Sequence, residues 1–178
     1  MLTEAQKRVV HLLLQHAPLE GAEAAAHHFA LTYAELEPVL FDPRTVPVHV
    51  VGAAVVVAPG GGLLVRFDAG LGRWRPPWGH APQHQDAAEA ALEAAREAWP
   101  GATLRLARPQ RIWDVGLWDI PAVEDVRAHR HLVLAFVVEV LGETPAPGAP
   151  FVLAPVTDLG QRLGTEPGAR WAQKLSRP

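Results

Sequence analysis

The chain has 178 residues, of which 49% are hydrophobic and 20% are charged, and these values predict one globular domain with an ordinary hydrophobic core. A net charge of −3 gives no reason to expect a nucleic acid as partner, and the absence of cysteine excludes disulfides and thiolate metal sites. No apolar run approaches the roughly 18 residues of a membrane span, and the short N-terminal run does not fit a signal peptide, so we expect a cytoplasmic protein without membrane contact.

The first 42 residues predict a helical hairpin in front of the main domain. Thr3 suits an N-cap, because Gln6 follows three residues later and an apolar run at helical spacing lies behind it. A second helical segment, residues 22–36, ends near Pro38. We expect this extension, residues 1–42, to pack on the sheet or to make a homodimer contact, while residues 43–178 form the main domain.

The main domain begins with strand patterns. Residues 49–58 are apolar on both faces and rich in valine, as a buried central strand is. A Pro-Gly-Gly-Gly turn follows, and residues 63–67 return as a hairpin partner. Two later stretches, 103–113 and 128–141, predict further strands, and the acidic and aromatic segment 114–127 between them predicts a functional loop.

The C-terminal part carries weaker patterns. Residues 151–153 predict a short strand, and Thr157 predicts the cap of a short helix over 158–163. The tail from Gly164 gives no clear pattern, and we expect it to be loosely held apart from Trp171. The whole order of elements is typical of an α/β layered fold with a mixed sheet.

Between the strand patterns, residues 74–101 predict a Pro/Gly turn, a polar loop and an alanine-rich helix that Pro100 ends. At 100° per residue, one face of this helix is apolar and must be the buried side. The acidic residues lie on other faces, where solvated carboxylates are the simplest interpretation and a relocated metal site is the alternative. The apolar stripe is Ala88, Leu92, Ala95 and Trp99, and the acidic stripe is Asp86, Glu89, Glu93 and Glu97.

The spacing of this segment resembles the Nudix box, the loop–helix that holds Mg²⁺ in hydrolases of nucleoside diphosphate derivatives. Gly79 stands at the first glycine of that motif, and the Leu-Gly-Arg-Trp run at 71–74 is similar to its lead-in. The resemblance covers about residues 47–165. It implies a Nudix-like α/β/α sandwich with a mixed β-sheet, preceded here by the N-terminal helical hairpin.

Most of the side chains that a Nudix box uses are replaced. Ala94 and Ala98 stand at two of the three metal-binding positions on the helix flank, and Gln85 stands at the first glutamate. Mg²⁺ prefers several oxygen ligands, so the resemblance implies Mg²⁺, or Mn²⁺ in its place, held weakly or not at all. Glu97 is the remaining metal ligand, and Glu97 with Glu93 would carry any residual catalysis.

Two functional interpretations follow from the resemblance. We favour a protein with little or no hydrolase activity that binds a nucleoside diphosphate derivative or another protein. The alternative is an active Nudix hydrolase that holds Mg²⁺ with Glu97 and with acids from outside the box, such as those of residues 114–125. Indole rings in the loops suit stacking on a nucleobase, and the candidate substrate-binding residues are Trp78, Trp118, Arg73 and Asp119.

The nine histidines raise a separate possibility. His129 and His131 alternate on a predicted strand, so their side chains point to the same face. Imidazoles from His49, His80 and His84 would have to join them to hold a transition metal. Ordinary structural histidines with local hydrogen bonds are the interpretation that we favour, and a metal site at His129 and His131 stays open.

Overall fold

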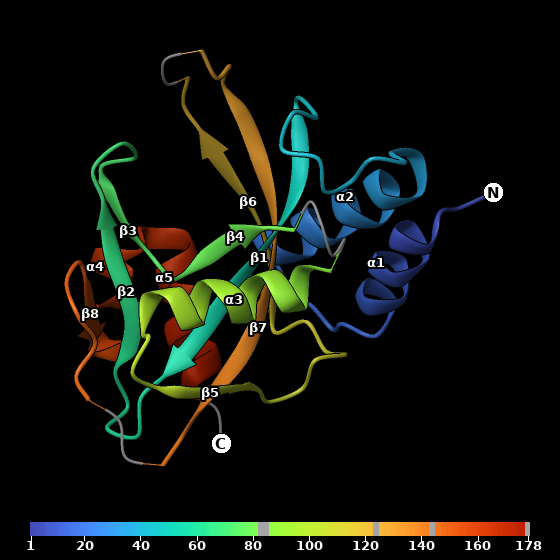
Figure 1. The fold of residues 1–178 in the computed structure, drawn as a ribbon. Helices are drawn as coiled ribbons and strands as arrows, with labels where there is room; N and C mark the ends of the chain where they lie inside the picture. The colour runs from blue at the N-terminus through green and yellow to red at the C-terminus, as the bar shows by residue number, and fades with distance from the viewer. Residues whose placement is uncertain (82–85, 123–124, 143–144, 177–178) are drawn as a thin grey trace.

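The computed structural model describes residues 1–81, 86–122, 125–142 and 145–176. Within them, eight strands form one mixed sheet (Figure 1). Its centre is β1 (Val48–Val57), which runs parallel to β7 (His129–Leu141) over its whole length. The remaining strands, each in antiparallel pairing, are β2 (Leu63–Asp68), β3 (Arg73–Arg75), β4 (Trp78–His80), β5 (Thr103–Leu106), β6 (Asp114–Ile120) and β8 (Phe151–Ala154).

Helices cover both faces of this sheet, as the predicted α/β/α sandwich requires. Figure 1 shows α3 crossing in front of β1, with α4 and α5 behind the sheet. Side chains of α1, α2 and α3 share one hydrophobic cluster with the sheet, and α4 and α5 belong to a second one. The helices are α1 (Glu4–Leu14), α2 (Ala22–Leu36), α3 (Ala87–Ala98), α4 (Leu159–Arg162) and α5 (Thr165–Leu175), with a 3-10 turn at Val156–Asp158.

The N-terminal hairpin is present and packs on the domain core. Thr3 accepts a hydrogen bond from the Gln6 backbone N–H, and the Gln6 side chain accepts one from the Thr3 N–H. This reciprocal pair is the capping box that the sequence predicts. Buried side chains of both helices, among them Leu13 and Ala30, join the cluster beneath α3. The boundary between residues 42 and 43 stays a prediction.

Helix α3 has the faces that its sequence predicts. The four residues of the apolar stripe are buried, and Asp86 caps the helix by accepting hydrogen bonds from the backbone N–H groups of Ala88 and Glu89. Asp86 also pairs with Arg8 of α1. Glu89, Glu93 and Glu97 are exposed. The acidic stripe is therefore a cap followed by a solvated face.

Four sequence predictions are wrong. Residues 114–127 are not one loop, because Asp114–Ile120 forms β6 and pairs with β7, whereas the strand expected over 103–113 ends at Leu106. The tail beyond Gly164 is not loosely held, because it forms α5 with Arg170 and Trp171 buried. Nor does Thr157 cap the short helix, since α4 begins at Leu159 without a side-chain cap. The errors at β6 and α5 depend on partners that are distant in sequence.

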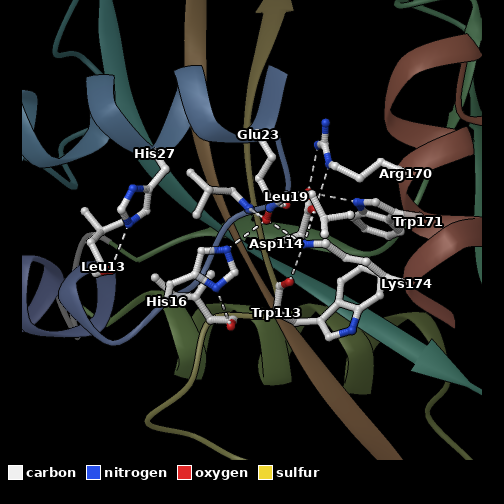
Figure 2. Close-up of polar contacts among 12 residues, drawn as sticks. Leu13, His16, Leu19, Glu23, His27, Trp113, Asp114, Arg170, Trp171 and Lys174 are labelled. Atoms are coloured by element: carbon white, nitrogen blue, oxygen red, sulfur yellow. Dashed lines mark hydrogen bonds and ion pairs between the residues drawn. The ribbon is translucent and has the colours of Figure 1, made fainter. Parts of the chain in front are cut away.

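A buried polar network joins α2 to α5 at the start of β6 (Figure 2). Glu23 is 0% exposed and accepts hydrogen bonds from His16, from Lys174 and from the Leu19 backbone N–H. Asp114 accepts from Lys174 too, at 2.8 Å, and also pairs with a second cation of α5. Asp114 is therefore engaged in ion pairs that hold α5 against the start of β6. Within the described residues, no helix has the length and apolar character needed to cross a membrane.

This network predicts a pH dependence of stability. Burial alone would raise the pKa of Glu23, but the hydrogen bonds from His16, Lys174 and Leu19, with the charge of Lys174, outweigh it and lower that pKa to about 2. A carboxyl whose pKa is lowered in the folded state stabilises the protein above its unfolded pKa and loses that contribution as the pH falls towards the folded pKa. The window is thus from about 4.5 down to about 2. The contribution is on the order of 2–3 kcal/mol.

Urea unfolding across that pH window measures this contribution. We expect Glu23→Gln to be less stable than the parent at pH 6, and the difference between the two to shrink as the pH falls below 4.5. Glu20→Gln is the matched control, because Glu20 is exposed on the same hairpin. A Glu23→Gln protein whose stability changes with pH as steeply as the parent's would contradict the assignment.

Candidate functional site

A depression of about 230 Å³ lies beside α3, where the Nudix resemblance places its metal site. Strand β4 pairs with β1 and runs next to the helix. A Cβ at Gly79 would make ordinary van der Waals contact with α3, 3.4 Å from the Ala90 carbonyl oxygen and 3.7 Å from the Ala94 Cβ. The lining residues are Arg66, Pro77, Trp78, Ala94, Glu97, Ala98 and Phe151.

The chemistry of this depression does not fit a bound Mg²⁺ ion. Among the described residues that line it, Glu97 is the only carboxylate, and Ala94 and Ala98 present methyl groups. Glu93 is exposed and does not line it, and Gln85 lies outside the described residues. Mg²⁺ demands near-octahedral oxygen coordination. The residues present supply one such ligand.

The same depression is suited to an anion that carries a ring. Arg66 places its guanidinium carbon 5.5 Å from the ring centroid of Phe151, and Trp78 adds a second aromatic side chain to the lining. Guanidinium groups bind phosphate in a bidentate manner, and aromatic faces stack on planar rings. These three side chains come from β2, β4 and β8, which the sheet brings together.

The other predicted substrate contacts lie at a different place. Trp118 and Arg73 line a much smaller depression with Trp171 of α5. Arg73 donates a hydrogen bond of 3.2 Å to the backbone carbonyl of Asp119, whose side chain is exposed. Neither Arg73, Trp118 nor Asp119 lines the depression that contains Glu97. Of the four predicted substrate contacts, Trp78 alone lines the depression beside α3, and the other three lie elsewhere.

A second cluster of functional side chains lies where β1 and β7 begin. His49 and His131 are opposite each other in the parallel register, and His129 lies on the same face of β7. One ring nitrogen from each of the three lies within 4.8 Å of the others. His80 of β4 adjoins them, with its Nε2 3.1 Å from Nε2 of His49. His84, the fifth histidine that the sequence suggests, lies outside the described residues.

This histidine cluster is largely shielded from water. His49 is 0% and His131 is 2% exposed, whereas His129 and His80 are half-buried. Burial, reinforced by the neighbouring histidines, lowers the pKa of His131 to about 2 and that of His80 to about 4. Burial also lowers the pKa of His49. These rings are therefore neutral near pH 7, which is the form of imidazole that binds metals.

The side chains around the cluster are aromatic and cationic. The indole of Trp78 lies 4.7 Å from the His131 ring, centroid to centroid. The guanidinium of Arg75 lies over the Trp78 ring, 4.6 Å from its centroid. Arg75 forms an ion pair with Asp68, so its charge is compensated locally. Trp78 thus borders both the histidine cluster and the depression beside α3.

Solved structures similar to this chain include Nudix hydrolases. The Ap4A hydrolase of C. elegans matches 71% of this chain and 95% of its own length, with 14% identity and a TM-score of 0.49. The MutT protein of Methanosarcina mazei Go1 matches 74% and 94%, with 12% identity and a TM-score of 0.48. A UDP-X diphosphatase matches 85% and 77%, with 15% identity and a TM-score of 0.46.

These similarities concern the arrangement of the chain. No model of a protein family matches the sequence, and curated proteins give no match either. The chain's own elements form an α/β sandwich with a mixed sheet. Its chemistry has to be argued from its own side chains.

Proposed function

We propose that this protein is a Nudix-like ligand-binding module that cleaves nucleoside diphosphate-linked compounds little or not at all. The observation that carries the proposal is the flank of α3 that lines the depression, where Ala94 and Ala98 stand beside Glu97. An Mg²⁺ or Mn²⁺ ion carried in by a diphosphate would gain one protein carboxylate there. Such an ion lacks the ligands that fix its geometry and lower the pKa of an attacking water.

The expected ligand is a small anion attached to a planar ring, of the class of nucleoside diphosphate derivatives. Arg66 supplies the positive charge for phosphate, and Trp78 and Phe151 supply the apolar faces for a ring. Two of the acids considered as replacements for the lost glutamates do not line this depression, because Asp114 is buried in ion pairs and Asp119 lies elsewhere. This supports binding without efficient cleavage over an active hydrolase.

A binding and cleavage assay tests the proposal. The protein is incubated with Mg²⁺ or Mn²⁺ and a panel of ADP- and UDP-linked compounds, and both thermal stabilisation and release of the cleaved nucleotide are followed. We expect at least one compound to stabilise the protein without turnover. Arg66→Ala should weaken its binding roughly tenfold, since a hydrogen bond to a charged group contributes about 1.5–3 kcal/mol.

Matched variants separate the two interpretations. Arg108→Ala removes an exposed arginine far from the depression and should leave binding unchanged. Glu97→Gln should alter ligand binding little in the proposed module. Turnover that is robust in the parent and abolished by Glu97→Gln would instead establish the active hydrolase, with Glu97 as its metal ligand.

A further inference from the structure

We infer that His49, His129 and His131 form a binding site for a divalent transition-metal ion, with Zn²⁺ as the best fit and His80 beside the fourth position. The site goes beyond the proposed ligand site, because none of these histidines lines the depression beside α3. Its three members come from two strands far apart in sequence, and the parallel register of β1 with β7 brings them together.

The distances are those of ligands around a small tetrahedral ion. A Zn–N bond of 2.0–2.1 Å places the nitrogens of a tetrahedral site about 3.3 Å apart. Nε2 of His129 and Nε2 of His131 are 3.1 Å apart, and Nε2 of His80 is 3.1 Å from that of His49. Ring nitrogens of the three proposed ligands all lie within 4.8 Å of one another. A bound ion would need only small shifts of these rings.

The outer hydrogen bonds fix which nitrogen faces the site. Nδ1 of His49 lies 3.1 Å from the Thr45 carbonyl, and Nδ1 of His129 lies 2.8 Å from the Arg127 carbonyl. A carbonyl only accepts, so each Nδ1 carries the hydrogen, and in this tautomer the Nε2 lone pair is directed into the cluster. Metal-bound histidines are oriented by this kind of bond to a backbone carbonyl.

Without a cation, the cluster is held by hydrogen bonds between its own rings. Nε2 of His49 lies 3.1 Å from Nε2 of His80, and Nε2 of His129 lies 3.1 Å from that of His131, so each lone pair needs the hydrogen of one neighbouring ring. His80 and His131 each offer one hydrogen at most to these contacts. A metal ion accepts every lone pair at once, and the half-exposed His129 gives it a route from solvent.

The type of ligand selects the type of ion. The group holds imidazole nitrogen alone, without a carboxylate or a thiolate among its members, and imidazole suits zinc, copper, iron and nickel rather than Mg²⁺ or Ca²⁺. Three histidines with one further position form a recurring zinc arrangement. The guanidinium of Arg75 also acts on this site, and its ion pair with Asp68 offsets part of its charge.

Metal titration of the whole chain tests the site. The protein is treated with a chelator, dialysed and titrated with Zn²⁺ by calorimetry, and Co²⁺ is used in parallel because its visible spectrum reports tetrahedral coordination. We expect one ion per chain, a tetrahedral Co²⁺ spectrum, and a rise in melting temperature of roughly 5–10 °C at a Zn²⁺ concentration a hundred times Kd.

Substitutions locate the ion. His129→Ala should lower Zn²⁺ affinity at least roughly tenfold, and His80→Ala should lower it less. His129 is chosen because it is half-buried at the start of its strand, so the variant should fold, which circular dichroism checks. His28→Ala is the control for an exposed histidine, and Glu97→Gln is the control for the depression.

The outcomes decide between the two sites. The inference is supported if His129→Ala weakens Zn²⁺ binding while His28→Ala and Glu97→Gln leave it intact. This holds whatever the ligand assay gives. Absence of saturable binding at millimolar Zn²⁺ by the folded parent would overturn it. So would parent-like affinity in His129→Ala, or affinity lost on replacing Glu97.

Discussion

Replacing Asp114 with alanine is expected to lower the free energy of unfolding by about 3–5 kcal/mol, the effect of removing one partner from a buried ion pair. The Asp114 carboxylate accepts hydrogen bonds of 2.8 and 2.9 Å from Arg170, and others from Trp171 and Lys174. All four residues are buried or nearly so. The substitution leaves two cations of α5 without this carboxylate in a dry environment, where hydration does not replace it.

Asp119→Ala is the matched control, because Asp119 lies in the same strand with its side chain exposed. Exposed substitutions of this kind stay within about 0.5 kcal/mol. Urea unfolding and melting curves of both variants measure the difference, and the melting temperature of Asp114→Ala should fall by roughly 6–20 °C. Equal stabilities for the two variants would show that α5 is held by its apolar face alone.

Several elements are predictable from local sequence because their determinants are local. Patterns of a few residues predict three of them: the capping box at Thr3, the valine-rich β1 and the apolar stripe of α3. Spacing also locates the depression beside α3, since Ala94 and Glu97 fall on the flank that the helix period assigns to it. These features need no knowledge of a distant partner.

What depends on distant partners is harder to predict. Strand β6 mixes acidic and aromatic residues like a loop, and pairing with β7 makes it a strand. Likewise α5 carries Pro167 and Gly168 near its start, and its burial depends on Asp114, more than 50 residues earlier. The histidine cluster depends on the register that sets His49 opposite His131, which no local pattern specifies.

The contact between β1 and α3 supports both candidate sites, and Gly52→Ala is expected to disrupt it with a loss of about 3 kcal/mol or more. A Cβ at Gly52 would lie 1.9 Å from the Ala87 carbonyl oxygen and 2.8 Å from the Ala91 backbone nitrogen. Overpacking a core usually costs about 1–3 kcal/mol. Here the obstructing atoms are backbone and cannot rotate away, so either α3 shifts or β1 bends.

Gly60→Ala provides the comparison, because a Cβ there meets nothing within 4 Å and its φ is not positive. That variant should keep or slightly raise stability, by up to about 1 kcal/mol. Gly52 also lies opposite Gly79 of β4 and Leu134 of β7. A folded Gly52→Ala protein should therefore lose affinity at the depression beside α3, where the helix moves, and retain more of its Zn²⁺ affinity. Parent-like stability in Gly52→Ala, measured by urea unfolding, would mean that α3 does not sit against β1 as closely as these distances require.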